Sequence, residues 1–168
     1  MDRYKLMIQY DGSAFFGWQL QVKERTVQGV LELAVQKISG SKDRIPVHGA
    51  GRTDTGVHAL GQVAHVDVET RLNEDDLKSA LNGNLPPECR VMDIEKVNKN
   101  FQARFDAIKR HYQYQCFTGD SILYKNQSWH LQKLDLRRLN RLAIHLVGDH
   151  DFLSLSKFRE DMDHTRCI

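Results

Sequence analysis

The first residues of the chain alternate between apolar and polar side chains with the period of a β-strand. In residues 3–10 every second position is apolar or aromatic: Tyr4, Leu6, Ile8 and Tyr10. The positions between them form a more polar set: Lys5, Met7 and Gln9. A period of two places each set on its own face, so we expect a strand with one buried face. Further strands are predicted at residues 44–50, 61–68, 90–97 and 109–117.

Apolar residues at helical spacing predict three helices. Thr26 is a candidate N-cap for a helix to about residue 39, with a buried stripe formed by Val27, Val30, Leu31, Leu33, Ala34 and Ile38. Asn73 is a candidate cap for a helix to about residue 81, which Pro86 and Pro87 would stop. A third helix is expected at residues 135–147, with leucines on one side and Arg137, Arg138 and Arg141 on the other.

A glycine-rich run, GAGRTDTGVHA, joins the second and third predicted strands at residues 49–59. Glycine lets the backbone approach a ligand closely, so an arginine and an aspartate in such a loop are site candidates. In an extended segment Arg52 and Asp54 would point to the same side, where the guanidinium favours an ionised carboxylate suited to a nucleophile or base. The run Thr-Asp-Thr-Gly is also typical of an ordinary turn, and the residues alone leave both interpretations open.

The bulk properties of the chain are those of a globular protein. A length of 168 residues fits one domain, or one and part of a second. The net charge of +2 does not indicate a nucleic-acid-binding protein, but basic residues gather locally at Lys96, Lys99, Arg104, Lys109 and Arg110, and again at Lys133, Arg137, Arg138 and Arg141. Such clusters form either a solvated face or phosphate contacts.

Several classes of protein are excluded by what the motifs lack. The spacing of two glycines in residues 12–17 and 51–56 resembles a phosphate loop, but the Lys and Ser/Thr that should follow are absent. The zinc-deaminase pattern and the HExxH pattern are absent as well. His48, His58 and His65 are therefore expected to pack or bond locally, and we predict neither a metal nor a cofactor.

The cysteines and the N-terminal residues predict a cytoplasmic protein. Three cysteines, far apart and odd in number, argue against a disulfide framework and for a reducing compartment. The first residues, MDRYKLMIQYDG, show no apolar signal-peptide region, and no apolar run approaches the length of a membrane span. No membrane association is expected.

The glycine-rich run and the residues after it resemble the signature of the TruA-type tRNA pseudouridine synthases. The matching stretch reads GAGRTDTGVHALGQVAHV at residues 49–66. Further blocks keep the order and spacing of that family over nearly the whole chain: YDGSAFFGWQ at 10–19, RTVQGVLE at 25–32, NGNLP at 82–86, FQARF at 101–105 and RHYQY at 110–114.

The resemblance implies an α/β (α+β) pseudouridine synthase fold with a mainly antiparallel sheet flanked by helices. We expect an N-terminal α/β subdomain with the catalytic loop at residues 1–105 and the start of a C-terminal α/β subdomain at residues 106–168. One predicted strand and one helix are too little to bury a core alone, and chains of this family run on for roughly another hundred residues. The second subdomain is therefore expected to be incomplete, lacking a third site motif with a basic residue.

The resemblance also implies a reaction without a cofactor, the isomerisation of uridine to pseudouridine in the anticodon stem-loop of tRNA. Asp54 matches the catalytic aspartate of the family. Whether it attacks the base, attacks the sugar or abstracts a ribose proton stays open, and all three require the ionised carboxylate that an unperturbed aspartate carries at neutral pH. Arg52 would hold this carboxylate and occupy the gap left by the flipped base.

The remaining candidates would bind the RNA. Tyr112 matches the active-site tyrosine of the family and would stack on the flipped base, although a core aromatic on a strand is the alternative. Arg104 and Arg110, with Lys109, would contact phosphates, and His58 would support the loop. Trp18 and Gln19 either touch RNA or pack under the site.

The expected assembly is a homodimer in which one tRNA contacts both subunits. Two rival hypotheses stay open. The first is a catalytically incomplete RNA-binding fragment of such an enzyme, and the second is a purely structural domain with a turn at Asp54.

Overall fold

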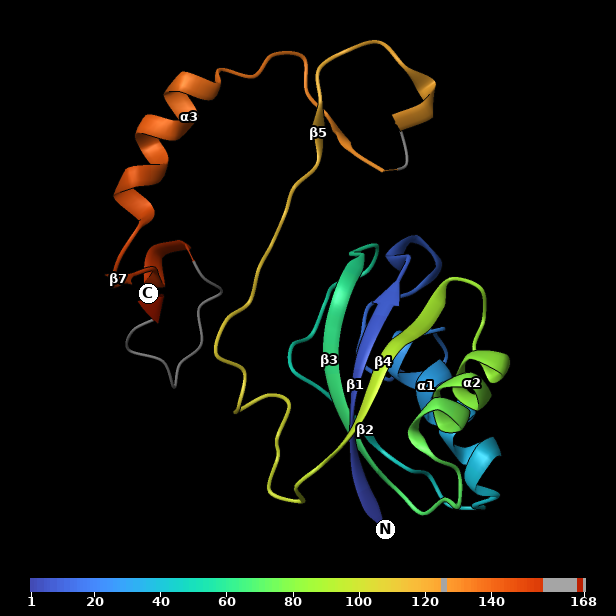
Figure 1. The fold of residues 1–168 in the computed structure, drawn as a ribbon. Helices are drawn as coiled ribbons and strands as arrows, with labels where there is room; N and C mark the ends of the chain where they lie inside the picture. Colours follow the sequence, from blue (N-terminus) through green and yellow to red (C-terminus); the bar gives the residue numbers. More distant parts are fainter. Residues whose placement is uncertain (125–126, 156–165, 168) are drawn as a thin grey trace. The chain divides into compact units, whose positions relative to one another are not determined.

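The computed structural model describes residues 1–124, 127–155 and 166–167. The chain divides into two compact units, Met1–Arg110 and His111–Ile168, which Figure 1 draws with the sequence running from blue to red. The expected boundary after residue 105 lies close to this division. The assignment of residues 106–168 to a second α/β subdomain stays a prediction, and residues 125–126, 156–165 and 168 of that range lie outside the described part.

The first unit contains a four-stranded sheet in the order β2-β3-β1-β4. Its strands are β1 (Asp2–Tyr10), β2 (Val47–Gly49), β3 (Ala59–Val68) and β4 (Cys89–Val97). All three pairings are antiparallel, as expected, with Leu6 opposite Ala64 on one side and Ile94 on the other. The second strand is shorter than predicted because Pro46 has no N–H group to donate to the ladder.

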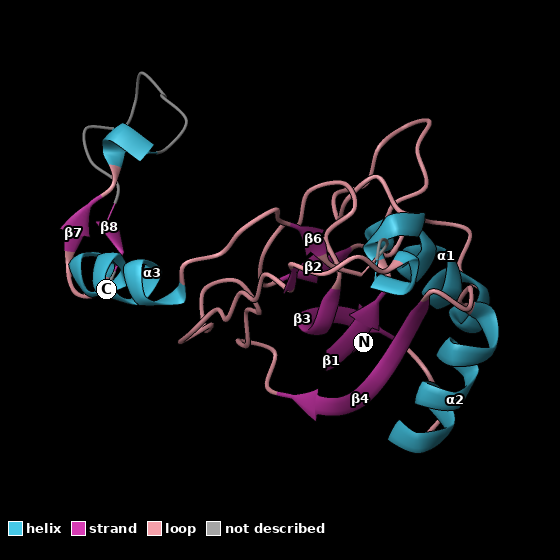
Figure 2. Ribbon diagram, turned by 90° about the horizontal axis from the view of Figure 1, so that it is seen from above, coloured by secondary structure: helices cyan, strands magenta, loops and turns pink. Residues whose placement is uncertain are grey.

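Two helices cover one face of this sheet, as Figure 2 shows from above. They are α1 (Val27–Ser39) and α2 (Glu74–Asn84). Both predicted caps are confirmed: the Thr26 hydroxyl accepts a hydrogen bond from the Gly29 N–H at 3.2 Å, and the Asn73 side chain accepts one from the Asp76 N–H at 2.9 Å. These caps satisfy backbone donors that have no partner within the helix.

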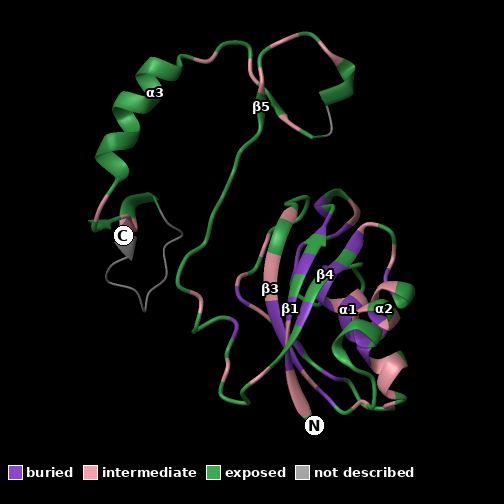
Figure 3. Cartoon of the chain, viewed as in Figure 1, coloured by how far each residue is buried: buried purple, intermediate pink, exposed green. Residues whose placement is uncertain are grey.

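The core lies between the sheet and the two helices. The alternating residues of β1 point into it, together with Val27, Leu31, Ala34 and Val35 of α1 and Leu77 and Leu81 of α2 (Figure 3). Leu33, predicted to lie in the buried stripe, is 58% exposed, and Val35 is buried instead. The reason is the period of 3.6 residues, which places Val35 and not Leu33 on the side of Leu31.

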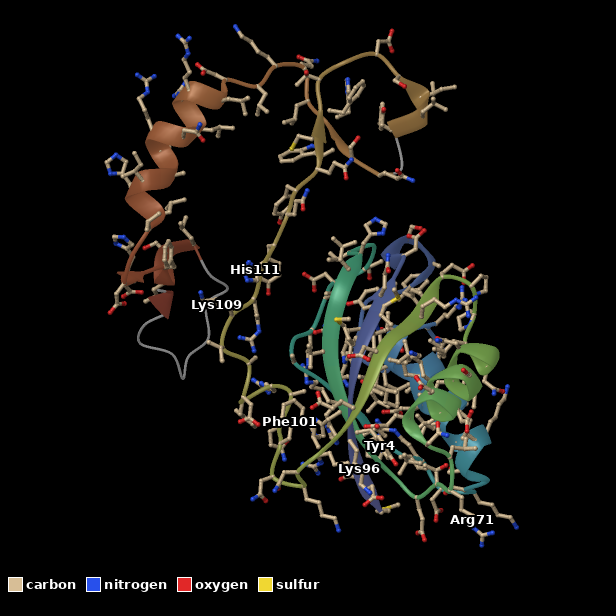
Figure 4. All side chains as sticks on the ribbon, in the orientation of Figure 1. Tyr4, Arg71, Lys96, Phe101, Lys109 and His111 are labelled. Atoms are coloured by element: carbon tan, nitrogen blue, oxygen red, sulfur yellow. The ribbon has the colours of Figure 1, made fainter. Side chains whose placement is uncertain are left out.

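The segment after β4, residues 98–110, runs along the face of the sheet that α1 and α2 do not cover. The Arg3 guanidinium donates to the Phe101 carbonyl at 2.8 Å, and the buried ring of His65 accepts from the Ala103 N–H at Nδ1, at 3.1 Å. Burial lowers the pKa of His65, which keeps Nδ1 an acceptor. Figure 4 labels Phe101 and Lys109 along this segment, which ends at Arg110 beside the glycine-rich loop.

The second unit has short elements and a helix. It contains β5 (Cys116–Phe117) parallel to β6 (Trp129–His130), η2 (Ile122–Tyr124), α3 (Leu136–Ala143), η3 (Ile144–Leu146), η4 (Leu153–Leu155), and β7 (His150–Asp151) antiparallel to β8 (Arg166–Cys167). The third predicted helix is confirmed at its start, where the Asp135 side chain caps the Arg138 N–H at 3.0 Å, and its last turn is a 3₁₀ helix. None of the described residues of this unit is buried.

The predicted strand at residues 109–117 is wrong except for its last two residues. Residues 110–114 make no backbone–backbone hydrogen bond within the described structure, so they have no ladder partner and form no strand. The alternative of Tyr112 as a core aromatic on a strand is wrong as well, since residue 112 lies in no strand and its side chain is exposed. None of the helices in the described ranges is long and apolar enough to cross a membrane.

Candidate functional site

The signature loop, residues 50–58, leaves β2 and enters β3 at the end of the sheet where β1 stops. Its centre is a turn: the Val57 N–H donates to the Asp54 carbonyl at 3.2 Å, and Gly56 has a φ of 82°. The turn expected from Thr-Asp-Thr-Gly is therefore present. It places the Asp54 side chain, which is exposed, at the first position of the turn.

Two side chains of the sheet make hydrogen bonds to the signature loop. The Tyr10 hydroxyl shares a hydrogen bond of 2.9 Å with the Thr53 hydroxyl, and the Gln62 side-chain amide donates to the Gly51 carbonyl at 2.7 Å. Tyr10 is buried, and this burial raises its pKa, so its hydroxyl stays protonated at neutral pH. The residues on both sides of Arg52 are thereby fixed.

The aromatic loop, residues 11–18, makes backbone hydrogen bonds to the signature loop. The Trp18 N–H donates to the Thr53 carbonyl at 3.0 Å, and the Gly56 N–H donates to the Phe15 carbonyl at 3.4 Å. Gly17 has a φ of 81°, and a Cβ there would lie 2.7 Å from the Thr53 carbonyl oxygen. A side chain at this position would push the two loops apart.

Trp18 packs under the site. It is 2% exposed, and a Cβ on Gly49 would lie 2.6 Å from its indole ring. Of the two alternatives for this residue, packing beneath the loop is the one that the structure shows. The exposed side chain of Gln19 donates to the Gln28 side chain at 3.0 Å.

A buried polar network connects helix α1 to both sides of the site. Glu32 accepts from the Val47 N–H at 3.0 Å and from the Gln28 amide at 2.9 Å, and it pairs with Arg44 at 2.6 Å. The Gln28 side-chain oxygen accepts from the Leu20 N–H at 2.9 Å. The start of β2 and the end of the aromatic loop are thus held by one helix, and all these buried groups find partners.

Arg52 and Asp54 do not pair in this structure. Both side chains are exposed, and none of the ion pairs among the described residues joins them. The expected pairing assumed strand alternation, but the chain has left β2 before Arg52 and turns at Asp54. The Asp54 carboxylate is therefore exposed to solvent, whereas the backbone of its loop makes hydrogen bonds to the sheet and to the aromatic loop.

Arg110 contacts the signature loop itself. Its guanidinium donates to the Ala50 carbonyl at 2.9 Å and to the Arg104 carbonyl at 3.3 Å, and its side chain lies beside Gly51, where a Cβ would be in ordinary van der Waals contact with its Nε at 3.6 Å. The guanidinium of Arg104 lies over the ring of Phe105, 5.6 Å from its centroid, and is exposed. Arg110 therefore holds the loop, a role that its sequence position did not indicate.

His58, in the signature loop, contacts the aromatic loop, and its part in the site stays a prediction. Its Nδ1 lies 3.2 Å from the Gly12 N–H nitrogen and 3.1 Å from an Asp11 carboxylate oxygen. A neutral ring accepts from Gly12 there, and a protonated ring donates to Asp11. Hydrogen bonds from the Ser13 hydroxyl and N–H, with a smaller contribution from His58, lower the pKa of Asp11.

Tyr112 belongs to the second unit, where its ring is 77% exposed. Its place in one site with Asp54 stays a prediction. Two surface hollows of about 360 Å³ each lie along α1, and neither is lined by the signature loop. The described residues contain no group of three His, Cys, Asp or Glu side chains placed to hold a metal ion.

Sequence reasoning missed several residues that position the site: Tyr10, Gln62, Gly12, Gly17, Gln28 and Glu32. Tyr10, Gly12 and Gly17 lie in one of the matching blocks, and Gln28 and Glu32 lie in the next. Polar residues within an otherwise apolar helix stripe were the signal available for the last two.

Comparison with known proteins matches this same region. The family profile described as tRNA pseudouridine synthase matches residues 6–106. Two curated relatives are the tRNA pseudouridine synthase A of Parvibaculum lavamentivorans, 46% identical over 156 residues, and that of Rhodopseudomonas palustris strain HaA2, 47% identical over 156 residues. Each alignment covers 90% of this chain and 63% of the relative, so the chain spans less than two thirds of their length. Because the profile covers both helices, the sheet and the signature loop, the chain belongs to the tRNA pseudouridine synthase family.

Proposed function

We propose that this chain carries the catalytic aspartate of an enzyme that isomerises uridine to pseudouridine in the anticodon stem-loop of tRNA. The observation that carries the proposal is the presentation of Asp54: its carboxylate is exposed while its loop is fixed by Tyr10, Gln62 and Arg110. A nucleophile or base gains most from a backbone that is already in place, because no ordering cost remains when the substrate binds.

The chemistry requires an ionised carboxylate and a uridine turned out of its stack. An unperturbed aspartate is ionised at neutral pH, so Asp54 needs a fixed direction and not a changed acidity. Turning the base out costs a few kcal/mol, which an aromatic partner such as Tyr112 would return in part. Arg52, free of Asp54 in this structure, is available to fill the gap in the RNA, and Arg104 and Lys109 to contact phosphates.

The homodimer, the absence of a cofactor and the cytoplasmic location stay predictions. A second candidate function is RNA binding without catalysis, and the observation behind it is that Arg104 and Lys109 are exposed and make no ion pair among the described residues. Both functions require tRNA affinity, so product analysis has to separate them.

The test is Asp54→Asn, which keeps the shape of the side chain and removes its negative charge. We expect product to fall by at least about a hundredfold while tRNA affinity changes little. The measurement is pseudouridine content and binding for an unmodified tRNA transcript. Asp43→Asn, at an exposed aspartate in the loop after α1, is the matched control and should behave as the parent.

Three other outcomes have definite meanings. Product near the parent rate in Asp54→Asn would contradict the catalytic assignment. Binding without product in the parent chain would support the second candidate function. No binding in the parent would contradict both.

A further inference from the structure

The aromatic loop carries one ring that the core does not use. Phe15 and Trp18 are each 2% exposed, whereas Phe16, between them in sequence, is 51% exposed. Phe15 packs edge-on against Tyr10 with a centroid distance of 6.4 Å. The loop therefore divides its aromatic residues into a buried pair and one outward ring.

The backbone that carries Phe16 is fixed on both sides. The Phe16 N–H donates to the Arg25 carbonyl at 2.9 Å, and the Phe16 carbonyl accepts from the Gln21 side chain at 2.9 Å. An exposed ring on a held backbone loses little conformational freedom when a partner stacks on it.

Phe16 also stands next to the catalytic loop. The carbonyl of Phe15 accepts from Gly56, and a Cβ on Gly17 would lie 3.3 Å from the carbonyl carbon of Asp54. The residues before and after Phe16 thus touch the backbone of the turn that carries Asp54. Consecutive Cα atoms are about 3.8 Å apart, so the backbone that carries the outward ring lies beside the turn that carries Asp54.

We propose that Phe16 is a stacking platform for an unpaired nucleobase of the RNA beside the uridine that reacts, a deepening that rests on the proposed function. A stem-loop offers unstacked bases on either side of its target, and every base has a face on which an aromatic ring can stack. The contact is apolar and releases no counterion, which separates it from the contribution of the arginines and lysines.

The experiment measures the affinity of the full chain for an unmodified anticodon stem-loop RNA at several salt concentrations. Phe16→Ala should bind about 5- to 150-fold more weakly, with the same slope of log affinity against log salt. Phe16→Tyr should restore the affinity, and Phe16→Leu, which keeps apolar area without a π-face, should lose nearly as much as Phe16→Ala. Val22→Ala is the control, because Val22 is a fully exposed apolar residue of the segment that follows the same loop.

The outcomes separate this inference from the function on which it rests. Parent affinity in Phe16→Ala or Phe16→Leu, or an equal loss in Val22→Ala, overturns the stacking platform while RNA binding by the chain stands. No binding by the parent chain overturns the proposed function and this inference together. Thermal melting of each variant serves as the fold control, since a half-exposed ring adds little to the core.

Discussion

At the scale of single residues, the hydroxyl of Tyr10 connects the hydrophobic core to the signature loop. It is buried on the helix-covered face of β1 and reaches the side chain of Thr53, one residue before Asp54. A partly buried hydrogen bond of this kind contributes about 1 kcal/mol to stability. The larger consequence of this hydrogen bond is that the signature loop adopts fewer conformations. The Asp54 side chain can then take fewer directions.

We therefore expect Tyr10→Phe to loosen the signature loop more than it destabilises the fold. The unfolding free energy should fall by about 1 kcal/mol, and amide hydrogen exchange in residues 51–56 should become faster. Under the proposed function, kcat should fall with KM nearly unchanged, because the aspartate is misdirected and RNA contacts remain. Urea unfolding, hydrogen exchange and steady-state kinetics give the three readouts.

Tyr4→Phe is the matched control for this prediction. Tyr4 is buried on the same face of the same strand, six residues earlier, and its hydroxyl makes no hydrogen bond to the signature loop. Exchange in the loop should be unaffected there. Equal exchange in both variants would show that the Tyr10 hydroxyl does not order the loop.

At the scale of elements, the contact between the aromatic loop and the signature loop depends on glycine. Gly17 combines a φ of 81° with a Cβ position 2.7 Å from the Thr53 carbonyl oxygen. Gly40, at the end of α1, has a φ of 65° but no atom within 4 Å of its Cβ position. Comparing substitutions at these two glycines therefore separates the free-energy cost of a left-handed backbone from the cost of a steric clash.

Both Gly17→Ala and Gly40→Ala should lose about 1–2 kcal/mol for the left-handed backbone. Gly17→Ala should lose more, because the two loops must also separate, and that variant alone should lose product formation. Chemical denaturation compares the stabilities directly. Equal losses in the two variants, with equal product, would mean that the close approach of the loops is not required.

The same elements show how far sequence patterns reach. Alternation in residues 3–10 and the caps at Thr26 and Asn73 predicted β1, α1 and α2, because these depend on neighbours in sequence. Residues 109–117 alternate as well, yet most form no strand, since alternation says nothing of a ladder partner.

The candidate site was predicted in part for the same reason. The turn at Asp54 depends on local chemistry, and the sequence predicted it. The contacts of Arg110 with Ala50 and of Tyr10 with Thr53 join residues 60 and 43 positions apart. Such contacts follow from the fold and from no local pattern. Trp18 and Phe16, two residues apart, take opposite environments for the same reason.

At the scale of the whole molecule, the proposed RNA binding has to come from the placement of charge, because the net charge is only +2. Several basic residues of the first unit are already engaged: Arg3 with Asp67, Arg25 with Glu88, Arg44 with Glu32 and Lys96 with Asp2. Arg104 and Lys109, on the segment that leads to the signature loop, are exposed and make no ion pair among the described residues. Among the basic residues without an ion pair, these two lie on the segment that ends beside the signature loop, which makes them candidates for phosphate contacts.

We expect the double variant Arg104→Ala with Lys109→Ala to weaken tRNA binding and to reduce the slope of log affinity against log salt by about 1.5, since each lost phosphate contact removes about 0.7–0.9. Arg110 is left intact because it holds the Ala50 carbonyl, and its removal would disturb the loop as well. Lys37→Ala with Lys42→Ala, on the last turn of α1 and in the loop after it, removes the same charge away from the site. A salt titration of binding compares the two. An equal reduction in both slopes would mean that the RNA senses overall charge and not this segment, whereas a reduction confined to the first pair would place the phosphate path beside Asp54.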